Sequence, residues 1–201
     1  SQLFGIDLAA PVVRTAQMNM LAHGASYTNI IRHDGLALPH TIAPATHNTS
    51  FQSNQFDVIA TNPPFGADVR SCDKAYMADY ALAHKATDWI TARLQRHARQ
   101  QRMRERQTTE ILFLEQCYRW LKPHGLLAII LPDGILTNSS LQYVRDWLIE
   151  HWRILAIIAL PRTAFVATGA DVKTSILFLR KYPIEITAQL QALKHQVQEQ
   201  L

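Results

Sequence analysis

Residues 62–65 read Asn-Pro-Pro-Phe and directly follow the apolar segment at residues 56–60. The two prolines fix φ and lack backbone N–H donors, which leaves their carbonyl groups as rigid acceptors. Acceptors for both N–H bonds of a planar amine, such as the Asn62 side chain and the Pro63 carbonyl, would draw its nitrogen toward tetrahedral geometry. The nitrogen lone pair could then attack an electrophilic carbon. The segment therefore predicts a site that activates a planar amine, with Phe65 stacked on the substrate; the alternative is a tight turn with a core Phe.

Two acids follow the predicted strands that precede this segment. Asp7 comes directly after residues 3–6, and Asp34 comes shortly after residues 27–31. Carboxylates at the carboxyl ends of strands can accept hydrogen bonds from ribose hydroxyl groups and from an exocyclic amine, so both are candidates for binding an adenosine-containing cofactor. Each could instead cap the helix or turn that follows. A third acid, Asp133, lies in a Pro-Asp-Gly sequence and is expected to be a turn residue.

An amine on a base inside a duplex is reached only after the base is flipped out, and aromatic side chains on both faces of the base would offset that cost. Phe165 is the candidate for the second face, with ordinary core packing as the alternative. A basic run is predicted to be helical, and either DNA-phosphate contact or a solvated helix would explain it. Its members are the arginines at positions 93, 96, 99, 102, 104 and 106.

Apolar runs alternate with helical patterns, which predicts an α/β fold of the Rossmann-like type. The predicted strands are residues 3–6, 27–31, 56–60, 126–131, 154–160 and 174–179. The predicted helices are residues 11–21, a long helical region at 77–121, residues 142–151 and an amphipathic tail at 186–201. The continuous apolar run at 126–131 predicts a strand that is buried on both faces. Residues 36–54 show neither a helical nor a strand periodicity and are expected to form a loop. The expected domain division is 1–182 for a partial catalytic domain and 183–201 for the C-terminal helix.

The composition narrows the class of protein. The 201 residues carry a net charge of +4, a basic excess that permits a nucleic-acid partner without requiring one. The two cysteines have no metal-ligand or redox spacing, so a reducing, cytoplasmic location is expected. No apolar stretch is long enough to span a membrane, and the nine histidines show no metal-binding spacing, so neither a membrane nor a metal ion is expected.

Several segments together resemble the modification (methyltransferase) subunit of type I restriction-modification systems, within the gamma-type N6-adenine DNA methyltransferases. They run in the family's order over nearly the whole chain. The Leu-Pro-Asp-Gly-Ile-Leu and Lys-Thr-Ser-Ile-Leu-Phe-Leu segments point to the type I group in particular. The matching segments are residues 5–7 with 16–20, 33–36, 56–66, 121–136 and 169–179.

The resemblance implies a seven-stranded mixed sheet that binds S-adenosylmethionine and methylates adenine N6 in DNA. It places Asp7 at the cofactor ribose and Asp34 at the cofactor adenine, and it implies assembly with a specificity subunit and often a restriction nuclease. The site residues expected from it are Asp7, Asp34, Gly35 and Leu36 for the cofactor, Asn62, Pro63, Pro64 and Phe65 for catalysis, and Phe165 and Lys173 for the substrate.

Two alternatives remain beside this reading. The Asn-Pro-Pro-Phe chemistry also serves methylation of protein glutamine or rRNA guanine. In addition, no Gly-x-Gly occurs in the chain, although the family's first strand and its glycine-rich loop hold the methionine end of the cofactor. Both are expected to precede residue 1, so the chain alone is expected to bind S-adenosylmethionine weakly or not at all. A truncated DNA-binding or assembly module without activity is the remaining alternative.

Overall fold

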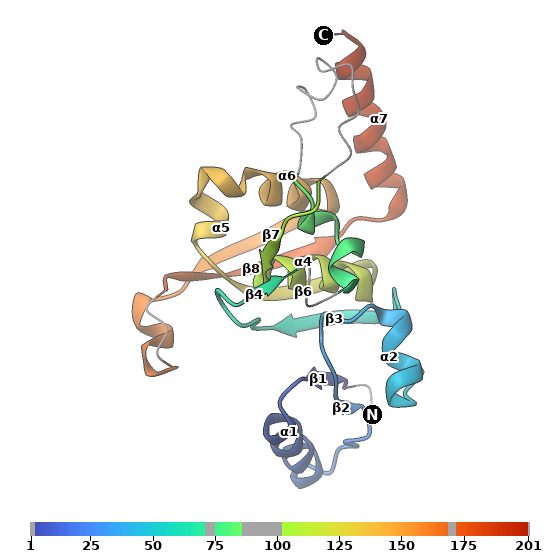
Figure 1. Cartoon of the computed structure of the whole chain (residues 1–201), viewed down its shortest axis with the longest axis vertical. Helices are drawn as coiled ribbons and strands as arrows, with labels where there is room; N and C mark the ends of the chain where they lie inside the picture. Colours follow the sequence, from blue (N-terminus) through green and yellow to red (C-terminus); the bar gives the residue numbers. More distant parts are fainter. Residues whose placement is uncertain (1–2, 71–74, 86–101, 169–171, 201) are drawn as a thin grey trace. The chain divides into compact units, whose positions relative to one another are not determined.

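The computed structural model describes residues 3–70, 75–85, 102–168 and 172–200. Contacts divide the chain into two compact units, Ser1–Gln55 and Phe56–Leu201. Figure 1 shows the elements of both units in chain order. Each unit is described by itself below.

The first unit is built on a parallel pair of short strands. Strand β1 (Gly5–Asp7) pairs with β2 (Ile30–Arg32). Helix α1 (Ala10–Ala22) connects them and begins with a proline in its first turn, where the missing N–H costs no helical hydrogen bond. Because the strands are parallel, the residues after both of them emerge at the same edge.

Helix α2 (Pro39–Thr46) lies within residues 36–54, for which the sequence predicts no helix. That prediction is wrong. Pro39 opens the helix and Ile42 is completely buried, so packing stabilises a segment whose own helical periodicity is weak.

The second unit contains a four-stranded mixed sheet in the order β3-β6-β8-β7. Its strands are β3 (Phe56–Thr61), β6 (Leu121–Pro132), β7 (Trp152–Ala159) and β8 (Thr174–Lys181). β3 is parallel to β6, and β8 is antiparallel to both β6 and β7. The α/β class with a mixed sheet is therefore confirmed. The carboxyl ends of β3, β6 and β7 all reach the edge at which β8 begins.

Helices α4 (Thr109–Trp120) and α6 (Gln142–His151) supply buried apolar side chains to one core with the sheet. The short helix α5 (Gly134–Thr137) adds Ile135 to that core, and α7 (Ile184–Gln200) forms the predicted C-terminal helix. Short 3-10 helices join these elements in the described residues: η1 (Ala75–Asp79), η2 (Ala81–Ala83), η3 (Ser139–Leu141) and η4 (Arg162–Thr168). None of the described helices combines the length and the apolar character needed to cross a membrane.

Strand β6 is buried on one face only, so the prediction of burial on both faces is wrong. Leu127, Ile129 and Leu131 are at most 2% exposed and belong to the core beneath α4 and α6. Leu126, on the other face, is 36% exposed. Apolar composition on both faces does not by itself show that both faces are covered.

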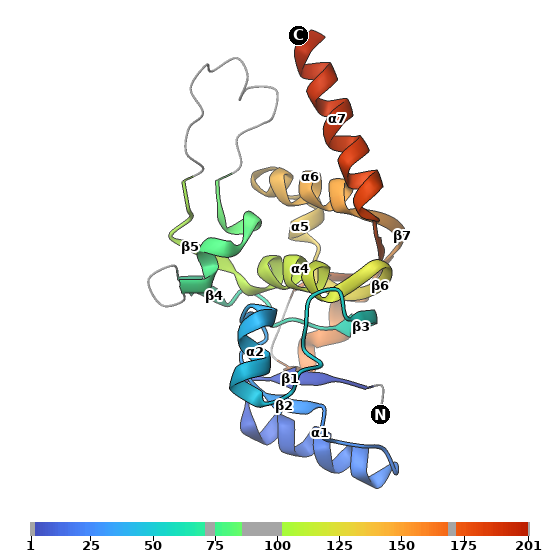
Figure 2. The ribbon, with the colours of Figure 1, turned by 90° about the vertical axis from the view of Figure 1, so that its right-hand side faces the viewer.

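Residues 77–121 do not form one helical region. Strand β4 (Asp68–Arg70) pairs antiparallel with β5 (Arg106–Thr108), and Figure 2 shows the two strands side by side next to α4. Of the basic run, Arg106 lies in β5 and Arg104 in an extended segment before it, where its backbone N–H donates to Ala83. The arginines at 93, 96 and 99 lie outside the described residues. The helical prediction is therefore wrong for the described end of the run, where strand pairing replaces the helix.

Lys181 is buried at the end of β8 and has two backbone partners. Its ammonium group donates to the carbonyl oxygens of Tyr118 at 2.7 Å and Leu121 at 2.8 Å, and it lies 4.1 Å from the centroid of the Tyr118 ring. Burial lowers the pKa of Lys181 from its ordinary value of 10.5 to about 8.

A pH-dependent stability follows from this pKa. Between about pH 8 and 10.5 the unfolded chain keeps the Lys181 proton that the folded chain has lost. The free energy of unfolding should therefore rise with pH in this window. We expect the stability difference between the wild-type protein and Lys181→Met, measured by urea unfolding at pH 7.5 and 9.5, to shift in favour of the wild type at the higher pH. Lys122→Met, which removes an exposed lysine paired with Asp57, should show no such shift, and a pH-independent difference for Lys181→Met would contradict the assignment.

Candidate active site

The Asn-Pro-Pro-Phe-Gly loop leaves the carboxyl end of β3 and is fastened to the start of α4. The hydroxyl Oγ1 of Thr109 donates to the Pro64 carbonyl oxygen at 2.7 Å. The backbone N–H of Gly66 donates to Oε2 of Glu110 at 3.2 Å, and the N–H of Thr109 donates to the Ala67 carbonyl at 2.8 Å. Residues more than forty positions apart in sequence thus hold the loop at three points.

The two side chains that make this clamp are buried. Thr109 is 9% exposed and Glu110 is 6% exposed. Glu110 lies in the first turn of α4, where the helix dipole favours a carboxylate. Gly66 has φ +67°, a conformation that other residues rarely adopt, so the chain can turn there toward β4.

The contacts to Thr109 and Glu110 give the acceptor groups of the loop different roles. Thr109 occupies the Pro64 carbonyl, so this carbonyl has a structural partner. Pro63 is buried, whereas Asn62 is exposed at the end of β3. This arrangement is compatible with a planar amine approaching the Asn62 side chain and the Pro63 carbonyl.

Phe65 and Phe165 come together although they lie a hundred positions apart. Their ring centroids are 5.5 Å apart, with an angle of 87° between the rings. This edge-to-face contact joins the loop after β3 to η4, which follows β7. Both rings are half-buried, and they touch each other directly, so a base could lie between them only if they moved apart.

A polar cluster lies on the two strands between those aromatic residues. Asp133, at the end of β6, accepts a hydrogen bond from Ser175 Oγ at 2.7 Å and lies 3.4 Å from Lys173 Nζ. The buried hydroxyl of Thr174 has no hydrogen-bond partner among the described residues. Asp133 therefore does more than occupy a turn: it orients Lys173, whose side chain is 60% exposed at the same edge.

Sequence reasoning missed Thr109 and Glu110, and it assigned Asp133 only to a turn. The signal for Asp133 was present, because it is the third acid at a strand end. No local pattern marks Thr109 or Glu110, since their partners lie in another part of the chain.

Asp7 and Asp34 belong to the first unit, where Asp7 is the last residue of β1 and Asp34 lies two residues after the end of β2. Oδ1 of Asp7 accepts from the Ala9 N–H at 2.7 Å, and Oδ1 of Asp34 accepts from the Leu36 N–H at 3.0 Å. These are the local turn contacts expected from the capping alternative. Gly35 is half-buried and Leu36 is 3% exposed, so Leu36 packs in the unit's core.

The acids of the first unit have acceptor capacity beyond their turn contacts. Each of these carboxylates can accept several hydrogen bonds, so a backbone contact to one oxygen leaves capacity for a ribose hydroxyl or an exocyclic amine. Their place beyond two parallel strands is where α/β sheets bind nucleotides. No cluster of three or more metal-ligating side chains occurs in the part of the chain that the structure describes.

Removal of the Thr109 hydroxyl should impair catalysis without unfolding the protein. We expect Thr109→Val to lower kcat of the reaction at this loop about tenfold, because the loop loses one anchor and its acceptors shift. KM for the amine substrate should change little. Thr109→Ser, which keeps the hydroxyl, should restore most of the rate. Thr46→Val, which removes a hydroxyl bonded to the Ile42 carbonyl in α2, is the matched control, and an equal loss in both Val variants would contradict the clamp.

The mixed α/β fold is that of S-adenosylmethionine-dependent methyltransferases, as the likeness to solved structures shows. The structure is similar to a type I restriction-modification methyltransferase subunit from Streptococcus thermophilus, with a TM-score of 0.61 and 25% identity over 90% of this chain and 34% of that one. It is also similar to the type I restriction enzyme EcoKI M protein, with a TM-score of 0.56 and 22% identity over 91% of this chain and 32% of that one.

The model of the N-6 DNA methylase family matches residues 1–198, so the chain belongs to this family. One curated relative is the type I restriction enzyme EcoEI methylase subunit of Escherichia coli, 29% identical over 90% of this chain and 30% of the relative. Another is the StySPI methylase subunit of Salmonella potsdam, 26% identical over 88% of this chain and 28% of the relative. The resemblance to type I modification subunits is confirmed, and the chain spans less than a third of these relatives' length.

Proposed function

We propose that this chain carries the catalytic region that transfers a methyl group from S-adenosylmethionine to adenine N6 in DNA. The observation that supports this most directly is the clamped loop, which presents the Asn62 side chain at the end of β3 while Thr109 holds Pro64. The cofactor, when bound, supplies an electrophilic methyl group on a positively charged sulfur. Asp7 and Asp34 would bind its ribose and its adenine, with Gly35 and Leu36 beside them.

The loop residues act on the amine that is to be methylated. The Asn62 carboxamide oxygen and the Pro63 carbonyl accept the two N–H bonds of adenine N6. These bonds favour a tetrahedral nitrogen whose lone pair is no longer delocalised into the ring. As the N–C bond forms, the methyl–sulfur bond would break with its electron pair left on sulfur. The positive charge that develops on nitrogen would then lie against two oxygen acceptors, which lowers the barrier. The proton that N6 must lose then passes to water.

The aromatic pair and the polar cluster serve the DNA. A flipped adenine would stack on Phe65, and Phe165 would separate from it to cover the other face. Lys173, oriented by Asp133, would contact the substrate at the same edge of the sheet. We further propose that the complete protein assembles with a specificity subunit and a restriction nuclease, in line with the type I modification subunits that it resembles.

The test is methyl transfer from tritiated S-adenosylmethionine by the intact protein with its co-purifying subunits. Unmethylated genomic DNA, ribosomal RNA and total protein are offered as separate acceptors. We expect label in DNA, at N6 of adenine after digestion to nucleosides. Label confined to protein glutamine or to guanine in rRNA would overturn the proposal in favour of the other planar amines, and no label in any acceptor would favour an inactive module.

A further inference from the structure

Two arginines face each other on the exposed side of the β4–β5 ribbon. Arg70 pairs directly with Arg106, while the next pair, Val69 and Gln107, is buried. Opposed residues on neighbouring strands have Cβ atoms about 4.5–5.5 Å apart, and like charges at this distance repel. The acid near Arg106 is Asp68, whose Oδ2 lies 3.6 Å from the Arg106 guanidinium. The side chain of Arg106 is nevertheless 74% exposed.

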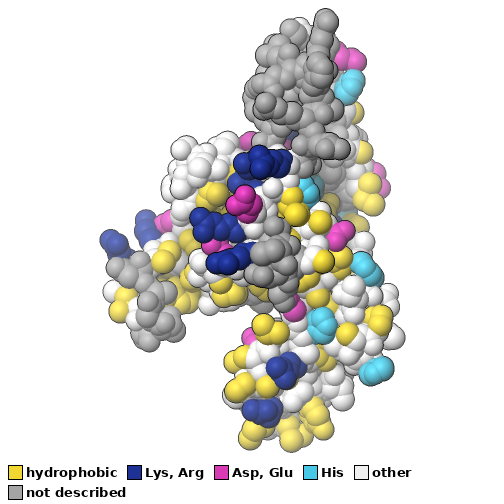
Figure 3. Space-filling model, in the orientation of Figure 1, with side chains coloured by type: hydrophobic (Ala, Val, Ile, Leu, Met, Phe, Trp, Pro, Cys, Tyr) yellow, Lys and Arg dark blue, Asp and Glu magenta, His cyan; other side chains and the backbone are white. Residues whose placement is uncertain are grey.

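The ribbon is continuous with the candidate catalytic loop at both of its strands. β4 begins two residues after Gly66, and β5 runs directly into Thr109, which donates to Pro64. At about 3.3 Å per residue, the arginine pair lies on the order of 10 Å along the chain from the clamped loop. Figure 3 shows Lys and Arg side chains gathered on the face of the molecule where Figure 1 shows β4.

A base that enters an active site from a duplex carries its sugar and two flanking phosphates to the mouth of that site. Two guanidinium groups side by side offer the paired N–H donors that bind phosphate oxygens in bidentate fashion. A phosphate between them would also remove their mutual repulsion. We propose that Arg70 and Arg106 form a binding site for a DNA backbone phosphate beside the flipped nucleotide, an inference that rests on the function proposed above.

The sheet contains a matched control. Arg153 and Arg180 are also exposed and directly opposed, but they lie at the end of the sheet where β6 begins, opposite to the loop end. In both pairs, two arginines lie directly opposite each other on neighbouring strands. Only the pair on the β4–β5 ribbon adjoins the Asn-Pro-Pro-Phe-Gly loop. The double variants Arg70→Gln/Arg106→Gln and Arg153→Gln/Arg180→Gln therefore remove equal charge at different places.

The experiment measures methyl transfer by the intact protein with its co-purifying subunits at several salt concentrations. We expect Arg70→Gln/Arg106→Gln to raise KM for DNA about tenfold at low salt, with kcat nearly unchanged, because the phosphate contacts contribute binding. The slope of log KM against log salt should fall by about 1, as for one lost phosphate contact. The Arg153→Gln/Arg180→Gln control should match the wild type. Equal KM values and salt slopes in both double variants would overturn the site.

Substituted DNA identifies the phosphate. After the methylated adenine has been mapped by sequencing, oligonucleotides are made with one neutral methylphosphonate at each position flanking it. At one position the methylphosphonate should raise the wild-type KM for DNA about as much as the double substitution does with unmodified DNA. The same methylphosphonate should not raise the KM of the double variant any further. If the effects of the methylphosphonate and of the double substitution on KM were fully additive at every flanking position, the proposal would be overturned. Absence of DNA methylation by the wild type would instead overturn the proposed function itself, so the two failures are distinguishable.

Discussion

Asn62→Ala is expected to lower kcat for methyl transfer to DNA by about 10²- to 10³-fold, the loss that follows removal of one acceptor or donor aimed at a transition-state charge. Asn62 is exposed at the end of β3, so folding should be unaffected. KM for DNA should change little, because phosphate contacts dominate DNA affinity. Initial rates with saturating cofactor, together with the circular dichroism melting curve, provide the measurement.

Asn62→Asp is the matched variant. It keeps the size of the side chain and an acceptor oxygen, and it replaces the amide N–H₂ with a second, negatively charged oxygen. It should therefore retain more activity than Asn62→Ala. Equal activity of the wild type and Asn62→Ala would show that the loop acts as a simple turn, and an unchanged kcat accompanied by a raised KM would place Asn62 in binding rather than in catalysis.

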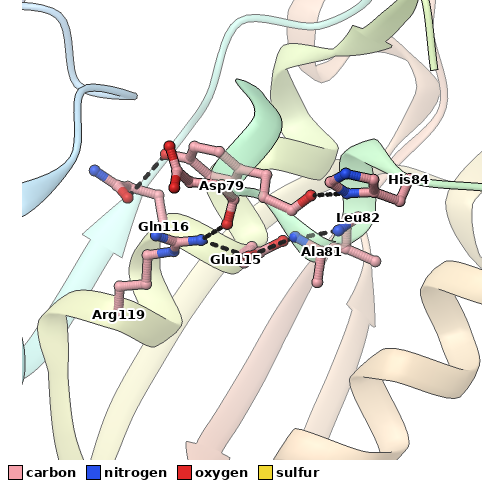
Figure 4. A network of polar contacts seen from close by, with 8 residues as sticks. Asp79, Ala81, Leu82, His84, Glu115, Gln116 and Arg119 are labelled. Carbon is pink, nitrogen blue, oxygen red and sulfur yellow. Dashed lines mark hydrogen bonds and ion pairs between the residues drawn. The ribbon is translucent and has the colours of Figure 1, made fainter. Parts of the chain in front are cut away.

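Glu115→Ala is expected to cost about 3–5 kcal/mol of stability, because it leaves buried polar groups without their acceptor. Figure 4 shows the network: Glu115, which is 5% exposed, accepts from the backbone N–H groups of Ala81 and Leu82 and from the Arg119 guanidinium, each at 2.9 Å. Arg119 also donates to the Asp79 carbonyl. One carboxylate on α4 thus holds η2 against the helix.

Urea unfolding at pH 7.5 measures this cost. Glu115→Gln, which keeps one acceptor oxygen, should be destabilised by roughly half as much. Glu185→Gln, which changes an exposed glutamate at the start of α7, should leave the midpoint unchanged. A midpoint for Glu115→Ala within the error of the control would mean that the network contributes no net stability.

The sequence predicts α6 and the four strands of the mixed sheet, β3, β6, β7 and β8, because each has a strong local signal. The apolar periodicity predicts a helix at residues 142–151, and the structure has α6 at those same positions. The run at 56–60 becomes β3, one residue longer, and Asn62 follows it as the amine-binding interpretation requires. The motif and its place after a strand are both local, so a single sequence reveals them.

The parts that could not be predicted depend on long-range pairing. β4 and β5 are three residues each and stabilise one another across a long stretch of chain, so neither has a visible period of its own. The clamp needs Thr109 to meet Pro64, and the aromatic pair needs Phe65 to meet Phe165. Tertiary contacts of this kind leave no trace in local spacing.

The clamp on the Asn-Pro-Pro-Phe-Gly loop also has an entropic consequence. Two prolines and the contacts to Thr109 and Glu110 restrict the loop before any substrate arrives. The conformational freedom of these residues is therefore lost during folding, and an incoming base does not have to order them. Substrate affinity at this loop should then vary little with changes that only stiffen it further, and it should fall when glycine replaces Pro64 and returns that freedom to the free protein.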